Sequence, residues 1–158
     1  MAKIRLERAQ PSDAPVIAEL IGELLREIMA VIGTQAFEFS QSDTEERARR
    51  WMSDHTYTVL LAHDADSVVG CLTLTENHAL YAEGAFGIIP ELYVRPAFRS
   101  RTVGAMLLAE AKQVARSKGW TRLEVTTPPL PQFDRTLAFY ERQGFSISGG
   151  RKMKVELP

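Results

Sequence analysis

Hydrophobic residues recur at helical spacing in two long segments of this chain. Over residues 12–32 they form a wide apolar face, with Ser12 as the expected N-cap and Gly33 placed to end the helix. Over residues 103–118 a second apolar stripe lies beside charged residues, and Gly119 follows it. These two segments are predicted to be the main helices that cover the core.

Two shorter helices are predicted between and after them. A capping box that begins at Ser42 opens a helix over residues 42–54, whose buried residues are expected to be Trp51 and Met52. A last helix is predicted over residues 134–143, after a proline-rich stretch that cannot itself be helical.

The remaining apolar segments are short and β-like, and they are bounded by polar or glycine-containing turns. They predict strands at residues 3–8, 57–62, 68–75, 86–94 and 123–126, and two final strands flanking Gly149-Gly150. Residues 86–94 are almost wholly apolar, which indicates a central strand. The order predicts one α/β (α+β) domain over residues 1–158: a mixed, mostly antiparallel sheet of about six to seven strands with about four helices on both faces.

Composition narrows the class of protein. The 158 residues carry a formal net charge of -1 with both signs interspersed, so no global field favours nucleic acid or an anionic membrane. No apolar run approaches the ~20 residues that span a bilayer, and the first residues lack the apolar stretch of a secretory signal. The single cysteine, Cys71, lies in an apolar strand pattern and is expected to be a buried, inert thiol. We therefore expect a cytoplasmic protein.

Candidate chemistry is concentrated where the strand ending at Val94 leads into the helix that begins at Val103. Between them lies a basic turn of small residues that includes Arg99 and Arg101. A helix N-terminus directs unpaired backbone N–H groups and a positive dipole end at whatever precedes it, so this turn is a candidate seat for a phosphorylated ligand. The alternative is a turn whose arginines only face solvent.

The same turn carries a family resemblance. Val94-x-Pro96 followed by Arg99-x-x-Thr102-x-Gly104 resembles the acetyl-CoA signature of the GNAT superfamily of N-acetyltransferases. Downstream, Phe139-Tyr140-Glu141-Arg142-Gln143-Gly144-Phe145 is similar to the F-Y-x-x-x-G-F segment of that superfamily. The resemblance covers nearly the whole chain in the right order. It implies a GNAT-like fold and transfer of an acetyl group from acetyl-CoA to an amine. Separately, no Cys/His cluster in the sequence suggests a metal site.

The resemblance also assigns residues to the coenzyme: Leu92, Tyr93, Val94, Arg99, Ser100, Arg101, Thr102, Val103, Gly104, Ala105, Asp134 and Tyr140. Two of them depart from the family pattern. Thr102 replaces a glycine, and a threonine can serve there only if its φ stays negative. Asp134 replaces an asparagine that contacts the pantetheine arm in many relatives, and an ionised carboxylate only accepts hydrogen bonds.

Two side chains are candidates for proton transfer. An amine with a pKa of ~10 costs about 4 kcal/mol to deprotonate at pH 7, and Glu91, which interrupts an apolar strand, is the candidate base, directly or through a water. Tyr140 is the candidate proton donor to the departing thiolate. The resemblance implies that the backbone N–H of Tyr93 or Val94 polarises the thioester. The alternatives are a Glu91 that faces solvent or pairs with an arginine, and a Tyr140 that is a core aromatic.

The acceptor site is less well specified. The resemblance places the loop with Phe37, Glu38 and Phe39 beside the acceptor, and aromatic rings flanking a carboxylate suit a cationic amine. The alternative is two apolar residues that pack a loop around an exposed glutamate. His78 and Tyr81 are further candidates, and a connecting loop explains both equally well.

These observations leave two function classes open. One is an N-acetyltransferase acting on a primary amine of a small molecule or an exposed protein amine, with a possible homodimer by analogy alone. The other is a non-catalytic acetyl-CoA-binding sensor of the same fold. Neither G-x-G-x-x-G nor G-x-x-x-x-G-K-[ST] occurs, which argues against a Rossmann or P-loop nucleotide-binding domain.

Overall fold

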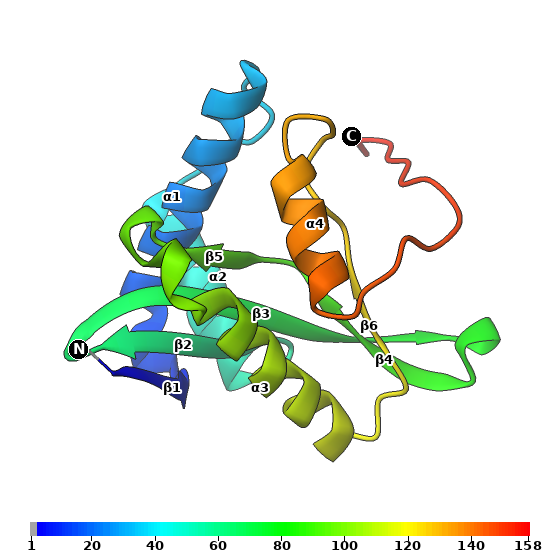
Figure 1. The fold of residues 1–158 in the computed structure, drawn as a ribbon, viewed down its shortest axis with the longest axis horizontal. Helices are drawn as coiled ribbons and strands as arrows, with labels where there is room; N and C mark the ends of the chain where they lie inside the picture. The colour runs from blue at the N-terminus through cyan, green and yellow to red at the C-terminus, as the bar shows by residue number, and fades with distance from the viewer. Residues whose placement is uncertain (1–2) are drawn as a thin grey trace.

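A computed structural model describes residues 3–158, with the side chain of Ser100 excepted. In chain order the elements are β1 Ile4–Arg8, the short 3-10 turn η1 Pro11–Asp13, α1 Ala14–Ile32, α2 Gln41–Ser53, β2 Thr58–Asp64, β3 Ser67–Ala79, η2 Leu80–Ala82, β4 Gly84–Ile89, β5 Leu92–Val94, η3 Pro96–Arg101, α3 Val103–Ser117, β6 Leu123–Val125 and α4 Asp134–Arg142. None of the helices in this range is long and apolar enough to cross a bilayer. The predicted mixed sheet with helices on both faces is confirmed (Figure 1).

The described strands form one six-stranded sheet in the order β1-β2-β3-β4-β6, with β5 paired to β3. All pairs are antiparallel except β4 with β6. Residues 75–79 of β3 pair with β4, and residues 70–72 of β3 pair with β5. Hence β4 and β5 follow one another along the same edge of β3.

The single strand predicted over residues 86–94 is therefore wrong, because the chain breaks it at Pro90 and Glu91. A proline has no N–H to donate to a ladder, which makes it a natural point of interruption. Beyond this break β5 pairs with β3 alone, and β6 pairs with β4 alone. The sheet consequently opens between β5 and the end of β6.

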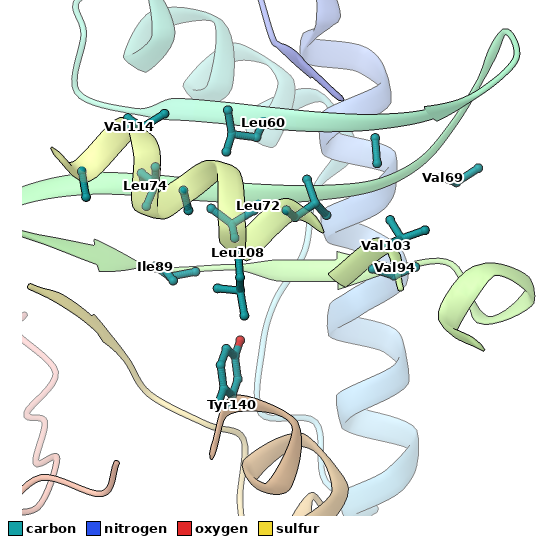
Figure 2. Close-up of a cluster of buried hydrophobic side chains, with 14 of the residues drawn as sticks. Leu60, Val69, Leu72, Leu74, Ile89, Val94, Val103, Leu108, Val114 and Tyr140 are labelled. Carbon is teal, nitrogen blue, oxygen red and sulfur yellow. The ribbon is translucent and has the colours of Figure 1, made fainter. Parts of the chain in front are cut away.

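Two apolar cores lie on the two faces of the sheet. On one face α1 and α2 pack against Val59, Leu61, Cys71 and Tyr93. On the other face α3 packs against a set that includes Leu60, Leu72, Leu74, Val94 and Tyr140 (Figure 2). Successive residues of β2 thus point to opposite faces, as the strand period requires. Figure 1 shows α3 in front of the sheet and α1 with α2 behind it.

Both expected helix caps are displaced by one or two residues. Asp13, not Ser12, holds the N-cap position of α1 without a side-chain bond to that helix, and its Oδ2 instead accepts the Gln10 N–H at 2.8 Å across η1. Ser40, not Ser42, caps α2, and its Oγ accepts the Asp43 N–H at 3.3 Å. A serine two residues earlier offers the same capping chemistry, so the sequence alone did not separate the two positions.

The C-terminal segment departs most from expectation. The two strands predicted around Gly149-Gly150 are absent, and residues 143–158 form no helix or strand. The apolar side chains of this segment are largely exposed: Ile147, Met153, Val155 and Leu157. Alternation fixes which side chains share a face of a strand, but it does not supply a neighbouring strand to pair with.

Candidate active site

A groove of about 1320 Å³ follows the opening in the sheet. Its walls come from α1, from β5 and the Pro90-Glu91 break, from the first turn of α3, from the segment after β6, and from α4. Of the residues expected to act in the site, the groove is lined by Phe37, Glu91, Leu92, Tyr93, Val94, Arg99, Thr102, Gly104, Ala105 and Tyr140. Segments from three distant parts of the sequence, around α1, from the end of β4 to the start of α3, and from the end of β6 to α4, therefore meet along one cleft.

The register of β5 determines which backbone groups face this groove. Thr73 donates its N–H to the Glu91 carbonyl at 2.9 Å, and Arg95 donates to the Val69 carbonyl at 2.8 Å. In an antiparallel ladder alternate residues point their polar groups to opposite sides, so Leu92 and Val94 turn theirs away from β3. Val94 is the better-placed donor of the two considered from the sequence, since the N–H of Tyr93 is directed at β3.

The first turn of α3 presents a second row of donors. The first intrahelical bond runs from the Met106 N–H to the Thr102 carbonyl at 3.0 Å, so the N–H groups of Val103, Gly104 and Ala105 have no acceptor within the helix. A Cβ on Gly104 would lie 3.0 Å from Phe139 Cζ, which shows how closely α3 approaches α4 here. Val103 is fully buried and is not among the residues that line the groove, whereas Gly104 and Ala105 are.

Thr102 adopts φ 60° and ψ 14°, which is the left-handed conformation. The condition set from the sequence, that a threonine can serve here only with a negative φ, is therefore not met. Its Oγ1 donates to the Arg101 carbonyl at 2.6 Å and so is not the cap of α3. A left-handed β-branched residue is strained, and the turn retains here the backbone shape for which a glycine is ordinarily used.

The two arginines of the turn point in different directions. Arg99 lines the groove, where its Nε donates to the Val94 carbonyl at 2.8 Å and its guanidinium reaches Glu27 Oε1 at 2.7 Å. Arg101 instead lies 3.4 Å from Asp64 Oδ2, with its guanidinium over the Phe98 ring. The side chain expected from Ser100 lies outside the described part of the chain. Arg99 is thus the arginine that can meet a ligand in the groove.

Glu91 is held on the α1–α2 face of the sheet. Thr73 Oγ1 donates to its Oε1 at 2.5 Å, and the Tyr57 hydroxyl donates to both carboxylate oxygens at 3.3 and 3.4 Å. Burial raises the pKa of Glu91, and the hydrogen bonds from Thr73 and Tyr57 lower it by less. A buried carboxyl group with a raised pKa in a cleft is suited to proton transfer. It does not pair with an arginine, which was the alternative considered from the sequence.

Sequence reasoning missed both partners of Glu91. Thr73 shares its face of β3 with Cys71, two residues away, and the strand period could have shown that it points toward the same core. No local signal connects Tyr57 to Glu91. Cys71 itself is fully buried, as predicted, and burial raises the pKa of its thiol to about 12.

Tyr140 lies on the opposite, α3 face. Its ring packs edge-on against Phe139 and Phe145 at centroid distances of 5.4 Å, and Figure 2 shows its hydroxyl directed toward Leu108. Burial raises the pKa of the phenol to about 12, so the hydroxyl stays protonated at neutral pH. Asp134, at the start of α4, is exposed and does not belong to the groove lining in the described part of the chain.

The three residues of the expected acceptor loop separate. Phe37 lines the groove with Leu24, Leu25 and Ile28, whereas Glu38 is exposed and does not line it. Phe39 packs over Gly22, where a Cβ would lie 2.8 Å from its ring. The other two candidates lie apart from the groove lining: His78 is on β3, not in a loop, and Tyr81 is an exposed residue of η2.

An ion-pair network that the sequence analysis did not anticipate joins α1 to β5. Arg95 donates to both carboxylate oxygens of Glu23 at 3.2 and 3.0 Å and reaches Glu19 at 2.9 Å. The Tyr93 hydroxyl donates to Glu23 Oε1 at 3.2 Å. Glu19, Glu23 and Glu27 recur every four residues along one side of α1, and that spacing was the available signal. The network holds α1 beside the groove.

Hydrogen-bond donors and positive charge are gathered at one end of the groove. Backbone donors and Arg99 lie at its α3 end, and the open edge of β5 runs along it. Among residues 3–158, no three His, Cys, Asp or Glu side chains are grouped so that they could hold a metal ion.

Comparison with known proteins agrees with this geometry. The model of the Acetyltransferase (GNAT) family matches residues 21–145. The chain is 26% identical over 150 residues, 93% of both proteins, to the uncharacterized N-acetyltransferase YhfO of Bacillus subtilis (strain 168). It is 32% identical over 90 residues to the IAA acetyltransferase of Azospirillum brasilense, a match that spans 57% of this chain and 55% of that protein.

A solved structure shares the fold. The aminoglycoside acetyltransferase meta-AAC0020 from an uncultured soil metagenomic sample superposes with a TM-score of 0.77 over 98% of this chain and 97% of that chain, at 22% identity. With a family match over most of its length and an open sheet edge beside the signature turn, this chain belongs to the GNAT family of acetyltransferases.

Proposed function

We propose that this chain is an N-acetyltransferase that moves the acetyl group of acetyl-CoA to a primary amine of a small molecule or of an exposed protein or peptide. One observation carries the proposal. Glu91 and Tyr140 line the same groove from opposite faces of the sheet, with the unpaired edge of β5 between them. A base and an acid on either side of a reacting thioester are what this reaction requires.

The donor substrate would occupy the α3 side. The N–H groups at the start of α3 and the Arg99 guanidinium would bind its diphosphate, and each hydrogen bond to a charged group contributes roughly 1.5–3 kcal/mol. The pantetheine arm would extend along the free edge of β5, where Leu92 and Val94 offer backbone hydrogen bonds. This places the thioester near the Val94 N–H, which would polarise the carbonyl.

The acceptor would approach from the α1 side, where Glu91 lies. Glu91, directly or through a water, takes a proton from the ammonium so that the free amine attacks the carbonyl carbon. Its raised pKa makes it a stronger base than an exposed glutamate, while Thr73 and Tyr57 keep the carboxylate oriented.

Collapse of the tetrahedral intermediate forms the amide and breaks the C–S bond. Tyr140 donates a proton to the departing thiolate, and the apolar surroundings that raise the pKa of the phenol also raise the basicity of a thiolate formed beside it. The nitrogen loses two protons in all, one before attack and one from the tetrahedral intermediate, and both pass by way of Glu91 to solvent. The thiolate keeps the proton from Tyr140, and the phenol recovers one from solvent, so the net reaction releases one proton.

The test is an assay of thiol release from acetyl-CoA with a panel of primary amines, with the products identified by mass spectrometry. The proposal predicts an acetylated amine and one free thiol per product. Uptake of acetyl-CoA without thiol release in the presence of any amine would instead indicate a sensor of the same fold.

A further inference from the structure

On the α1 side the groove is lined by four apolar side chains and by Glu27, which is paired with Arg99. Leu24, Leu25 and Ile28 line it from one side of α1, and Phe37 follows from the segment after that helix. Phe37 is 39% exposed, so part of its ring is available to a ligand. Since α1 packs on the same face of the sheet that carries Glu91, these side chains line the groove on the side of the proposed base.

The carboxylates in the described groove lining already have partners. Glu27 accepts from Arg99 at 2.7 Å, and Glu91 accepts from Thr73 and Tyr57. The other charged side chains of the lining are cations: Arg135, Arg142 and Lys152. A phosphate can bind such a cation, but an ammonium group cannot. Glu27 is thus already paired with a cation, and Glu91 is the carboxylate of the described lining whose partners are both neutral.

We infer that the acceptor is a small monoamine carried by an aromatic or branched aliphatic body, and that polycations such as polyamines and aminoglycosides are poor acceptors. This inference rests on the proposed function. The single ammonium reaches Glu91 and loses its charge there, while the body packs on Leu25, Ile28 and Phe37. Each further ammonium of a polycation would lie on the apolar wall, where loss of hydration opposes binding.

The experiment compares kcat/KM at saturating acetyl-CoA for 2-phenylethylamine and 3-methylbutylamine with the values for spermidine, an aminoglycoside and a short peptide that begins with alanine. We expect the two apolar monoamines to exceed each of the others by at least about 10-fold, which is the discrimination that apolar pockets give. A ratio at or below one for any of the three would overturn the inference.

Three variants connect the preference to this wall. Phe37→Ala should lower kcat/KM for 2-phenylethylamine about 10-fold with KM for acetyl-CoA unchanged. Leu25→Glu adds a carboxylate to the wall and should narrow or invert the preference for 2-phenylethylamine over spermidine. Val31→Glu is the matched control, because Val31 is a 48% exposed residue of the same helix and lies outside the groove lining. The Val31→Glu variant should prefer 2-phenylethylamine over spermidine by the same factor as the wild type.

The two levels of the hypothesis fail in different ways. If spermidine is acetylated as well as 2-phenylethylamine, or if Leu25→Glu and Val31→Glu behave alike, the inference fails and the proposed function stands. If the wild-type protein takes up no acetyl-CoA by calorimetry, the proposed function itself fails. Uptake of acetyl-CoA with no amine consumed would contradict both.

Discussion

Replacing Glu91 by glutamine gives the sharpest test of the proposed chemistry. Glutamine keeps the shape of the side chain and an oxygen that can accept from Thr73, but it cannot take a proton. An alkylamine with a pKa of ~10 costs about 4 kcal/mol to deprotonate at pH 7, which corresponds to a factor of roughly 10³ in the fraction of free amine. We expect Glu91→Gln to lower kcat/KM by about 10²–10⁴ at pH 7, with little change in the affinity for acetyl-CoA.

The dependence of this loss on pH distinguishes a base from a residue that only maintains the structure. Below pH 10 the free amine increases about tenfold per pH unit without help from the protein. The ratio of wild-type to Glu91→Gln activity should therefore shrink steadily from pH 7 to pH 10. A ratio that stays constant over this range would refute the base role, even if the variant is slow.

The same substitution has a consequence for stability. Burial raises the pKa of Glu91 above its ordinary value of 4.5. The folded state thus binds the proton more tightly than the unfolded state, and the stability that this provides is present below pH 4.5 and lost as pH rises through the raised pKa. Glu91→Gln should unfold at higher urea concentration than the wild type at pH 8, and this advantage should be smaller at pH 5. If the difference in free energy of unfolding between Glu91→Gln and the wild type were less favourable to the variant at pH 8 than at pH 5, desolvation could not be the main cause of the raised pKa.

Three further predictions follow from individual contacts. Tyr140→Phe should lower kcat by about 10²–10⁴ with the affinity for acetyl-CoA nearly unchanged, and wild-type kcat in this variant would remove Tyr140 from the mechanism. The Thr73 hydroxyl donates to Glu91 Oε1 at 2.5 Å, and this hydrogen bond lowers the pKa of Glu91. Thr73→Val removes the hydroxyl, so the pKa of Glu91 should rise and the acid limb of the kcat/KM profile should move to higher pH. A shift of that limb to lower pH would be inconsistent with this contact. Thr102→Gly relieves a left-handed conformation at φ 60° and should raise the free energy of unfolding in urea by about 1 kcal/mol, whereas a loss of stability would show that Thr102 is not strained.

The parts of the fold that were predictable are those with a long, regular pattern. The apolar stripes of α1 and α3 extend over four or more turns, and both helices were found with boundaries within two residues. The break between β4 and β5 was not predicted, because the apolar run continues on both sides of Pro90. This break creates the open edge of β5 on which the proposed site depends. The hydrophobic pattern does not reveal the break, although it is the feature most important to the proposed function.

Within the site, sequence predicted chemical type better than direction. Glu91 was singled out because a carboxylate interrupts an apolar run, and Tyr140 because its segment resembles the F-Y-x-x-x-G-F segment of the family. The opposite orientations of Arg99 and Arg101 could not be predicted from the sequence, because both residues belong to one turn. Only their tertiary contacts, with Glu27 and Asp64 respectively, distinguish them. Likewise Phe37 and Phe39 differ by two residues, yet one lines the groove and the other packs on Gly22.

The central claim is that the turn before α3 and the free edge of β5 bind the diphosphate and pantetheine arm of acetyl-CoA. Titration calorimetry with acetyl-CoA and with acetyl-pantetheine, which lacks the nucleotide and its phosphates, tests this most directly. We predict micromolar affinity for acetyl-CoA and an affinity at least ~100-fold weaker for acetyl-pantetheine, a difference of about 2.7 kcal/mol. Equal affinities, or no heat of binding with acetyl-CoA, would contradict the claim.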